Sequence, residues 1–349
     1  MLLENFKYFA DRGVALTNYY ATTHPSEPNY FSSIAGDYFG MEDDDVYNAP
    51  EEVFTVVDLL ESKNISWAHY EEDMPSAGFT GASYVNQVNG QSDYVRKHNP
   101  AVSFKSVSGN KERLARLKTL NRNDETKSDF HKDLKANKLP QWMFITPNMT
   151  SDGHNSDVAT AGPRTRDCLT TLLTDKNVTQ YTLVLTTGNE SEIYTIRNQI
   201  LGILIGDAVP TELVGTEDKG FYNHYSEIAS VSANWDLPTL GRWDVGANVY
   251  NLVASKTGDK LREWKCDSEF QKYYWNAPYG GQYNENNDKK LVIPKPNLDL
   301  DESYSGRRIL PAIKAKFAHS KLPTYYQDTI KVYDPTHPPP GYPSPPEDE

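Results

Sequence analysis

The order of apolar and polar positions predicts alternating strands and helices over residues 1 to about 255. Short apolar runs with the length of strands lie at residues 13–21, 65–72, 139–148, 181–189 and 200–210. Apolar residues recur at helical spacing at residues 51–64 and 159–177 and again after residue 224. Unbroken runs such as TLVLTT are typical of strands inside a parallel sheet. The pattern therefore predicts an α/β fold, with a mainly parallel sheet flanked by helices.

Three stretches depart from this alternation. Residues 105–138 are densely charged, which predicts a solvated helical excursion. Residues 256–330 are rich in Tyr, Asn and Gly, and we expect them to form a C-terminal extension of strands and loops packed on the 1–255 core. Residues 331–349 are rich in proline and acidic residues, which predicts a disordered tail.

Charge and hydropathy narrow the classes of partner. The 349-residue chain has a formal net charge of −13, so its surface repels phosphate backbones and nucleic acid is not an expected partner. No apolar run is long enough to span a bilayer, so no membrane segment is expected. Glu4, Asn5 and Lys7 interrupt the apolar N-terminus, which therefore does not resemble a signal peptide. A cytoplasmic location follows if Met1 is the true start.

Polar side chains gather where the predicted strands end. In α/β folds, ligands bind at the carboxyl ends of the strands. The candidates at these ends are His24, Ser26, Asn29, Asp152, His154, Asn189, Glu190 and His224. So many polar strand ends predict one convergent site. His69, His98, His131, His319 and His337 have no such placement and are assigned to structure or surface.

The segment THPSEPN allows two interpretations of Ser26. As a nucleophile, Ser26 would need a base or a metal to activate its hydroxyl. The predicted helix that follows offers a positive N-terminal end to a phosphate, and Asn29 could donate a side-chain N–H to it. Alternatively, Ser26 only caps the helix and Pro28 is a first-turn proline. Both interpretations stay open at this point.

The other candidates also have two interpretations. Asp152 and His154 flank a glycine turn and offer a carboxylate and an imidazole, which are ligands for zinc or a similar ion. The same residues could simply form a polar turn. His224 precedes a predicted helix, so it could be a ligand or a residue at the start of that helix.

Five long blocks carry a resemblance to a known family. They are THPSEPNYFSSIAGDYFGM, YEEDMPSAGF, DYVRKHNPA, LPQWMFITPNMTSDGH and HYSEIASVSANWDLPTLGRWDVGAN. They resemble the fungal secreted acid phosphatases of the phosphoesterase family, which also includes bacterial phospholipase-C-type phosphatases. The resemblance extends over roughly residues 5 to 320. It implies an alkaline-phosphatase-like core, small phosphorylated substrates, and hydrolysis of phosphate monoesters at acid pH with a hydroxyl nucleophile and a divalent metal ion.

The resemblance also implies roles for individual residues. SEPN matches the order of nucleophile, Pro and Asn, which makes Ser26 the nucleophile and Asn29 a phosphate contact. His24, beside them, is a third catalytic candidate. The resemblance makes Asp152, His154 and His224 metal or phosphate ligands. Glu190 is a further candidate metal ligand.

Two departures from the family pattern predict impaired catalysis. Family members begin with an additional strand bearing a Leu-Glu-Asn-Thr type motif, and we expect that strand to be absent here, because Leu3-Glu4-Asn5 matches it only by coincidence. The family has Phe-Asp-Glu where this chain has Gly188, Asn189 and Glu190, so Asn189 is a weakened ligand position.

Three hypotheses follow from the residues and the resemblance together. The first is an impaired acid phosphatase that uses Ser26 and a weakly held metal. The second is a catalytically inactive relative that binds phosphate or a partner. The third, a phospholipase C acting on lipid head groups, is disfavoured by the acidic surface and by the lack of an amphipathic membrane helix.

Overall fold

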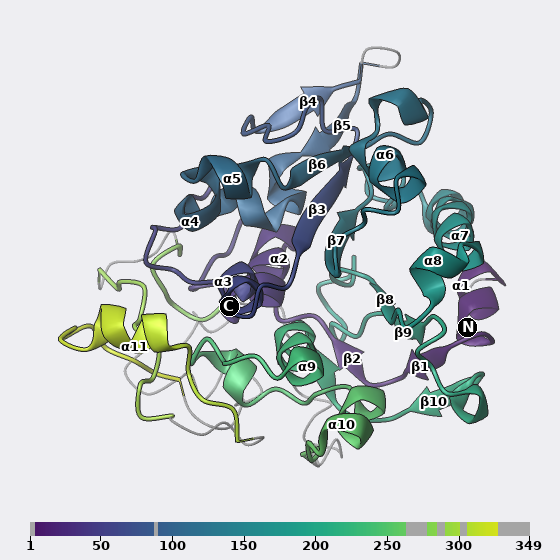
Figure 1. The fold of residues 1–349 in the computed structure, drawn as a ribbon. Helices are drawn as coiled ribbons and strands as arrows, with labels where there is room; N and C mark the ends of the chain where they lie inside the picture. Colours follow the sequence, from purple (N-terminus) through teal and green to yellow (C-terminus); the bar gives the residue numbers. More distant parts are fainter. Residues whose placement is uncertain (1–3, 87–89, 263–277, 285–289, 301–305, 327–349) are drawn as a thin grey trace.

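The computed structural model describes residues 4–86, 90–262, 278–284, 290–300 and 306–326 (Figure 1). The α-helices are α1 (Glu4–Ala10), α2 (Ser26–Ala35), α3 (Val56–Ser62), α4 (Lys105–Ser108), α5 (Lys111–Leu114), α6 (Asp129–Lys135), α7 (Val158–Thr174), α8 (Lys176–Thr179), α9 (Tyr225–Trp235), α10 (Asn251–Thr257) and α11 (Pro311–Phe317). The strands are β1 (Val14–Leu16), β2 (Tyr19–Tyr20), β3 (Trp67–Glu72), β4 (Ser83–Val85), β5 (Ser92–Val95), β6 (Leu117–Leu120), β7 (Trp142–Thr146), β8 (Val184–Thr187), β9 (Gly202–Ile205), β10 (Thr216–Asp218) and β11 (Tyr222–Asn223). The predicted tail at 331–349 lies outside the described residues.

One sheet is entirely parallel and has the order β6-β3-β7. Its central strand β3 is buried along its whole length, as expected for a parallel strand covered on both faces. In its register, His69 pairs with Leu117 on one side and with Phe144 on the other. The predicted α/β class with parallel strands flanked by helices is confirmed (Figure 1).

The second sheet is mixed, with the order β10-β1-β9-β8. Strand β1 is parallel to β10, but β9 is antiparallel to both β1 and β8. The expectation that TLVLTT lies inside a parallel sheet is therefore wrong. Residues 188–201 lead directly from β8 into β9 without a helix, and a parallel pair needs a longer crossover connection.

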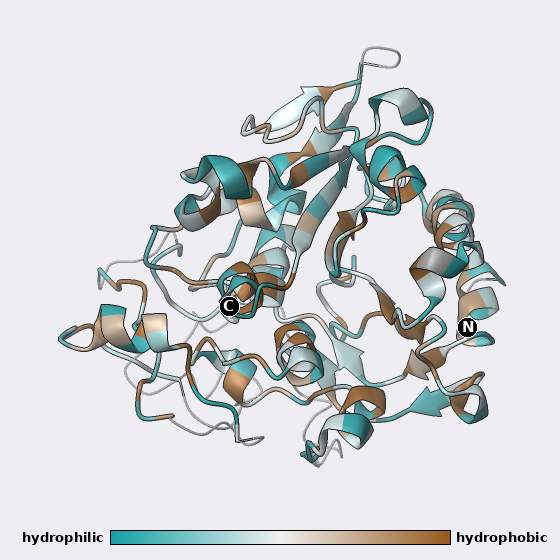
Figure 2. Ribbon diagram, viewed as in Figure 1, coloured by the Kyte–Doolittle hydropathy of each residue, from teal (hydrophilic) through white to brown (hydrophobic). Residues whose placement is uncertain are grey.

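Strands β7 and β8 each pair on one side only among the described residues, β7 with β3 and β8 with β9. Their side chains are half-exposed along most of their length, although the sequences WMFIT and VLTT are largely apolar or β-branched. Met143 and Ile145 of β7 and Val184 of β8 flank the same apolar cluster, built around Phe9, Tyr70 and Ile203 together with other buried residues. Figure 2 shows the apolar colouring of β7, β8 and β9.

The charged excursion at 105–138 is not purely helical as predicted. It contains α4, α5 and α6, but also the strand β6, which joins the parallel sheet. Leu117 and Leu120 are buried there, because the segment LKTL can place apolar residues against the core while Lys118 stays half-buried. A short strand inside a charge-rich segment is difficult to distinguish from a helix by the spacing of its apolar residues alone.

The C-terminal extension is coil plus α11 in its described part, where strands and loops were expected. It is attached to the core through Asp37, which accepts hydrogen bonds from the hydroxyls of Tyr279, Tyr325 and Tyr326. Burial raises the pKa of Asp37, and the hydrogen bonds from Tyr325 and Tyr326 oppose that shift. No described helix combines the length and apolar character needed to cross a bilayer.

Candidate active site

Ser26 is the first residue of α2, at the end of the loop that follows β2. Pro25 holds the N-cap position and makes no side-chain capping bond, so the interpretation of Ser26 as a cap is not what this structure shows. The Ser26 hydroxyl instead donates to Glu190 Oε1 at 2.6 Å. Both residues come from segments that follow strands, and Ser26 is only 4% exposed. A serine hydroxyl bonded to a carboxylate has the arrangement of a nucleophile with an adjacent base.

Asn29 holds the loop before Ser26 in place. Its Oδ1 accepts from the Thr22 and Thr23 backbone N–H groups at 2.9 and 3.1 Å and from the Thr22 hydroxyl at 2.8 Å. Its Nδ2 donates to the carbonyls of Thr23 and Pro25 at 2.8 and 2.9 Å. The side chain is fully buried and both amide hydrogens are used. In this structure Asn29 therefore positions the loop instead of offering a free N–H to a phosphate.

A hydrogen-bonded chain extends from Ser26 to α9. Asn189 donates through Nδ2 to the Ser26 carbonyl at 3.2 Å, and the Asn189 carbonyl lies 2.7 Å from His224 Nε2. His224 Nδ1 lies 2.9 Å from Glu227 Oε1, which also accepts from the Tyr19 hydroxyl at 3.0 Å. We call Ser26, Asn189, Glu190, His224, Glu227 and Tyr19 the nucleophile cluster. His224 occupies the N-cap position of α9, as the sequence suggested, and its ring orders both neighbours.

Glu190 is the charged member next to the nucleophile. Burial raises the pKa of Glu190. The Ser26 hydrogen bond and the nearby imidazoles of His98 and His224 lower it, and the charge of Asp44 raises it further. Its Oε2 is buried and has no hydrogen-bond partner among the described residues. Glu190 thus has one oxygen on Ser26 and one oxygen available to a substrate or a proton.

His24 is buried beside this cluster, at 1% exposure. Its ring stacks on Tyr194, with 4.0 Å between ring centroids. Burial lowers its pKa to about 4, so the ring is neutral over most of the pH range. Neither ring nitrogen has a hydrogen-bond partner within the described part of the chain.

A second group of side chains lies against Tyr30, in the second turn of α2. His98 stacks on Tyr30, with 5.1 Å between ring centroids, and its Nδ1 is 3.3 Å from Asp152 Oδ2. Its ring centroid is 6.0 Å from that of His154, which is exposed. We call Lys97, His98, Asp152 and His154 the histidine cluster. His98 is 5% exposed, and neither of its nitrogens makes a hydrogen bond among the described residues.

Asp44 connects α2 to the histidine cluster. Its Oδ1 accepts from the Glu27 backbone N–H at 2.8 Å, and its Oδ2 accepts from Lys97 Nζ at 2.8 Å. Glu27 itself is buried, and burial together with the charge of Asp44 raises its pKa to about 9. A protonated carboxyl therefore lies next to the candidate nucleophile over most of the pH range.

The predicted metal ligands do not assemble into one centre. No group of three His, Cys, Asp or Glu side chains among the described residues could hold a metal ion. Asp152 contacts His98, Glu190 accepts from Ser26, and both nitrogens of His224 are engaged. At Asn189, an amide donor faces a carbonyl where a metal site would need a carboxylate. The donors present therefore do not fit the implied cation.

Sequence reasoning missed His98, Lys97 and Asp44. His98 was assigned to structure or surface, yet the structure places it at the site. Its position after a strand could have identified it, because Arg96, Lys97 and His98 follow β5 directly and polar residues at strand ends are the candidates for the site. That strand has only four residues, so its end was not recognised. Asp44 is one of three consecutive aspartates in coil, and nothing in the sequence distinguishes it from the other two.

The amino-acid sequence matches the model of a known protein family. The model described as "Phosphoesterase family" matches residues 4–238. The chain belongs to the phosphoesterase family. It is 43% identical over 330 residues to a probable acid phosphatase of Kluyveromyces lactis, covering 93% of this chain and 75% of that protein. It is also 43% identical over 332 residues to an acid phosphatase of Aspergillus fumigatus, covering 95% and 72%.

Solved structures similar to this phosphoesterase-family chain include a protein of the alkaline phosphatase superfamily from Vibrio parahaemolyticus. The TM-score is 0.39 and the sequence identity is 9%, with 66% of this chain and 60% of that chain covered. The family assignment and the acid phosphatases among the relatives support phosphoesterase activity for this chain. The resemblance inferred from the sequence is therefore confirmed at the level of family.

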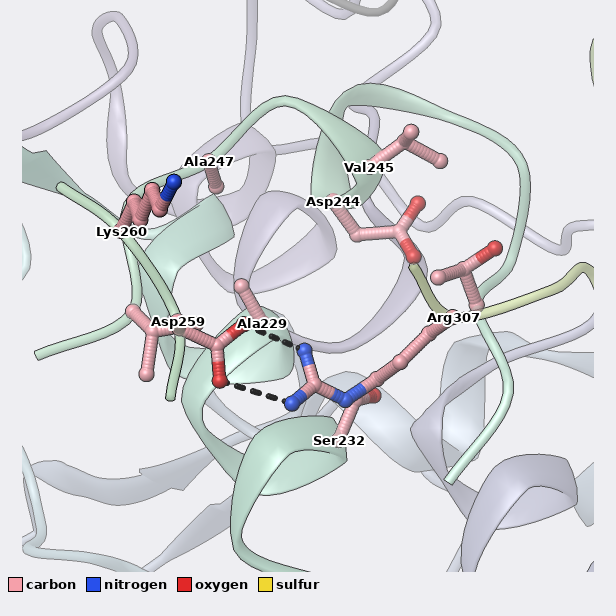
Figure 3. Close-up of a pocket in the computed structure, with 10 residues that line it drawn as sticks. Ala229, Ser232, Asp244, Val245, Ala247, Asp259, Lys260 and Arg307 are labelled. Atoms are coloured by element: carbon pink, nitrogen blue, oxygen red, sulfur yellow. Dashed lines mark hydrogen bonds and ion pairs between the residues drawn. The ribbon is translucent and has the colours of Figure 1, made fainter. Parts of the chain in front are cut away.

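A separate small cavity lies between α9 and the C-terminal extension (Figure 3). Its lining includes Ser232, Asp244, Asp259 and Arg307, and the last two form a bidentate pair at 2.6 and 2.7 Å. Ser26, Glu190 and His224 are not among the residues that line it. The bidentate pair joins two segments of the C-terminal extension, so we treat this cavity as a structural feature and not as the active site.

Proposed function

We propose that this chain hydrolyses phosphate monoesters with Ser26 as the nucleophile and Glu190 as its base. The observation that carries the proposal is the 2.6 Å hydrogen bond from the Ser26 hydroxyl to Glu190 Oε1 at the start of a ten-residue helix. The names of the relatives supply the substrate class, small phosphorylated molecules.

The reaction would run in two displacements. Ser26 Oγ attacks phosphorus, its proton passes to Glu190, and the bond from phosphorus to the ester oxygen breaks, with the leaving oxygen taking a proton from water. Water then attacks the phosphoseryl group and loses a proton to the hydroxide left by the first displacement, the bond from phosphorus to Oγ breaks, and Glu190 returns the proton to Ser26. Inorganic phosphate leaves, and the enzyme is restored without any redox change.

The remaining members of the nucleophile cluster would position these two groups. Asn189 holds the Ser26 carbonyl, and His224 holds the Asn189 carbonyl while Glu227 orients the imidazole. Asn29 fixes the loop that delivers Ser26. We assign His24 to packing beside the site, because its neutral ring is stacked under Tyr194. No step of this proposal passes through a metal, since the donors do not fit one.

A second candidate function is phosphate binding without turnover. It is favoured by one specific observation, that both amide hydrogens of Asn29 are already donated to carbonyls. A site that lacks this donor would stabilise the transition state less well than the resemblance implies.

Hydrolysis of an aryl phosphate between pH 3 and 8 separates the two candidates. We expect Ser26→Ala to lower kcat/KM by on the order of 10³-fold or more. The matched control is Ser33→Ala, because Ser33 is also buried on α2 but its hydroxyl donates to the Tyr30 carbonyl. Activity that survives in Ser26→Ala, or that is absent from the natural chain at every pH, would overturn the nucleophile assignment.

A further inference from the structure

The backbone N–H of Glu27, the residue directly after the candidate nucleophile, is occupied by a carboxylate of the chain itself. In the first turn of α2, Glu27 follows Ser26 directly and Pro28 has no N–H to offer. The Glu27 N–H donates to Asp44 Oδ1, and Lys97 Nζ donates to Asp44 Oδ2, each at 2.8 Å. These are a helix N-terminal amide and a cation, the two kinds of donor that bind phosphoryl oxygens.

We propose that Asp44 is an internal competitor, whose carboxylate holds the Glu27 N–H and Lys97 in the free site and is displaced by the phosphoryl group of a substrate. The proposal rests on the proposed function, because it places the phosphoryl group beside Ser26. It names Lys97 as a phosphoryl-binding residue and Asp44 as the residue that sets the affinity for phosphate.

An independent feature of the same face points to a ligand. His98 follows Lys97 directly, is 5% exposed, and has no hydrogen bond at either nitrogen within the described residues. Its ring stacks on Tyr30, which lies one helical turn after Ser26 on the same face of α2. The His98 Nδ1 has the Asp152 carboxylate at 3.3 Å, and a bound oxyanion would give this buried ring the hydrogen bond that it lacks.

The Asp44 side chain is also able to leave. It belongs to the coil between α2 and α3, and its carboxylate is 23% exposed while the Lys97 ammonium-bearing side chain is 19% exposed. Partly exposed ion pairs contribute little to stability, since both charges can be solvated when they separate. A phosphoryl group that replaces the carboxylate keeps the charge balance of Lys97 and the hydrogen bond of the helix amide.

Electrostatics around the site agree with this competition. Burial and, after it, the charge of Asp44 raise the pKa of Glu27, so Asp44 opposes any further negative charge beside Ser26. A phosphate that enters while Asp44 stays in place would meet the same repulsion. Removing the charge of Asp44 should therefore favour phosphate in two ways, by freeing two donors and by removing a like charge.

The test is calorimetric titration of inorganic phosphate into the full chain. Every protein titrated carries Ser26→Ala, so that no covalent step occurs. We expect Asp44→Asn to tighten phosphate binding about 3- to 10-fold. Asp43→Asn is the matched control and should stay within twofold, because Asp43 accepts from the Tyr47 hydroxyl and not from α2. Lys97→Met should weaken binding about tenfold, as expected for loss of a charge-assisted donor.

The outcomes separate this inference from the nucleophile assignment. Unchanged or weaker phosphate binding in Asp44→Asn, with the thermal midpoint preserved, would overturn the competitor role. Unchanged binding in Lys97→Met would overturn the donor assignment. Asp44→Ala serves as a second variant if Asp44→Asn is unstable. Either result leaves the role of Ser26 intact, because that role is read from turnover and not from binding.

Discussion

The nucleophile cluster and the histidine cluster lie on the same helix, α2, but are built differently. In the nucleophile cluster, hydrogen bonds of 2.6 to 3.2 Å join Ser26 to Glu190 and to Asn189, and Asn189 to His224. In the histidine cluster, His98 is buried without a hydrogen bond among the described residues, and His154 is exposed. Among the buried side-chain atoms of the first cluster, only Glu190 Oε2 lacks a hydrogen-bond partner within the described residues, whereas in the second both nitrogens of His98 lack one. We infer that chemistry belongs to the first and substrate binding to the second.

The largest expected effect is on turnover, in the nucleophile cluster. Glu190→Gln keeps an acceptor for the Ser26 hydroxyl but cannot take its proton, so we expect kcat/KM to fall about 10²- to 10³-fold. The acid limb of the pH–rate profile should also disappear, because that limb reports the raised pKa of Glu190. Glu192→Gln, an exposed residue of the same loop, is the control. A loss below fivefold in Glu190→Gln would remove Glu190 from catalysis.

The next effect concerns Glu27, which lies between the two clusters on α2. Its pKa is raised to about 9, so the folded chain keeps a proton that the unfolded chain releases above pH 4.5. Stability therefore falls as the pH rises from 4.5 towards 9. Glu27→Gln removes this pH dependence. The change that it makes in the free energy of unfolding should therefore be more stabilising at pH 7 than at pH 4, by about 1–3 kcal/mol. Urea unfolding at both pH values measures it, and equal effects would contradict the assigned protonation.

A smaller effect tests whether Asn189 belongs to this site as an amide. Asn189→Asp removes the donor to the Ser26 carbonyl and places a carboxylate there, which should cost about 1–2 kcal/mol of stability. We expect kcat/KM to fall about tenfold. The family pattern instead makes Asn189 a weakened ligand position, at which an aspartate would hold a cation more tightly. Assays with and without added divalent ions decide between the two, and a gain of activity in Asn189→Asp that depends on the ion would favour the metal-based site.

The smallest effect is on the stability of the histidine cluster. His98→Phe keeps the ring stacked on Tyr30 and removes two nitrogens that make no described hydrogen bond, so we expect a change within about 1 kcal/mol. His224→Phe is the matched comparison and should cost about 2–3 kcal/mol, because it breaks two hydrogen bonds. If thermal or urea unfolding showed the same loss of stability for both variants, the two clusters would not differ in how their histidines are bonded.

Several residues of the candidate site could be predicted from the sequence alone, but the strand pairing and the bonding of Asn29 could not. Ser26, Glu190 and His224 each lie beside a strand end, and the strand-end rule brought them together. The relative direction of β8 and β9 could not be predicted, because an apolar run has the same sequence pattern in a parallel and in an antiparallel pair. The actual bonding of Asn29 was also hidden, because its partners Thr22 and Thr23 precede it in a loop whose shape the sequence does not specify.

The metal prediction depended on resemblance more than on spacing. Asp152 and His154 have the residue types of ligands, but a metal site also requires other donors within reach. In this structure Asp152 contacts His98 instead, and His224 is saturated by Asn189 and Glu227. Which of several polar groups face one another is a property of the folded chain, and residue types alone do not determine it.

The central claim is that Ser26 attacks phosphorus, and covalent trapping tests it most directly. The full chain is mixed with an aryl phosphate, quenched in acid at a series of times, and digested for mass spectrometry. The account predicts a phosphoryl group on Ser26 in the natural chain and in Ser33→Ala, and none in Ser26→Ala, which also loses turnover. A phosphoryl group on a different residue, or turnover by Ser26→Ala at the natural rate, would contradict it.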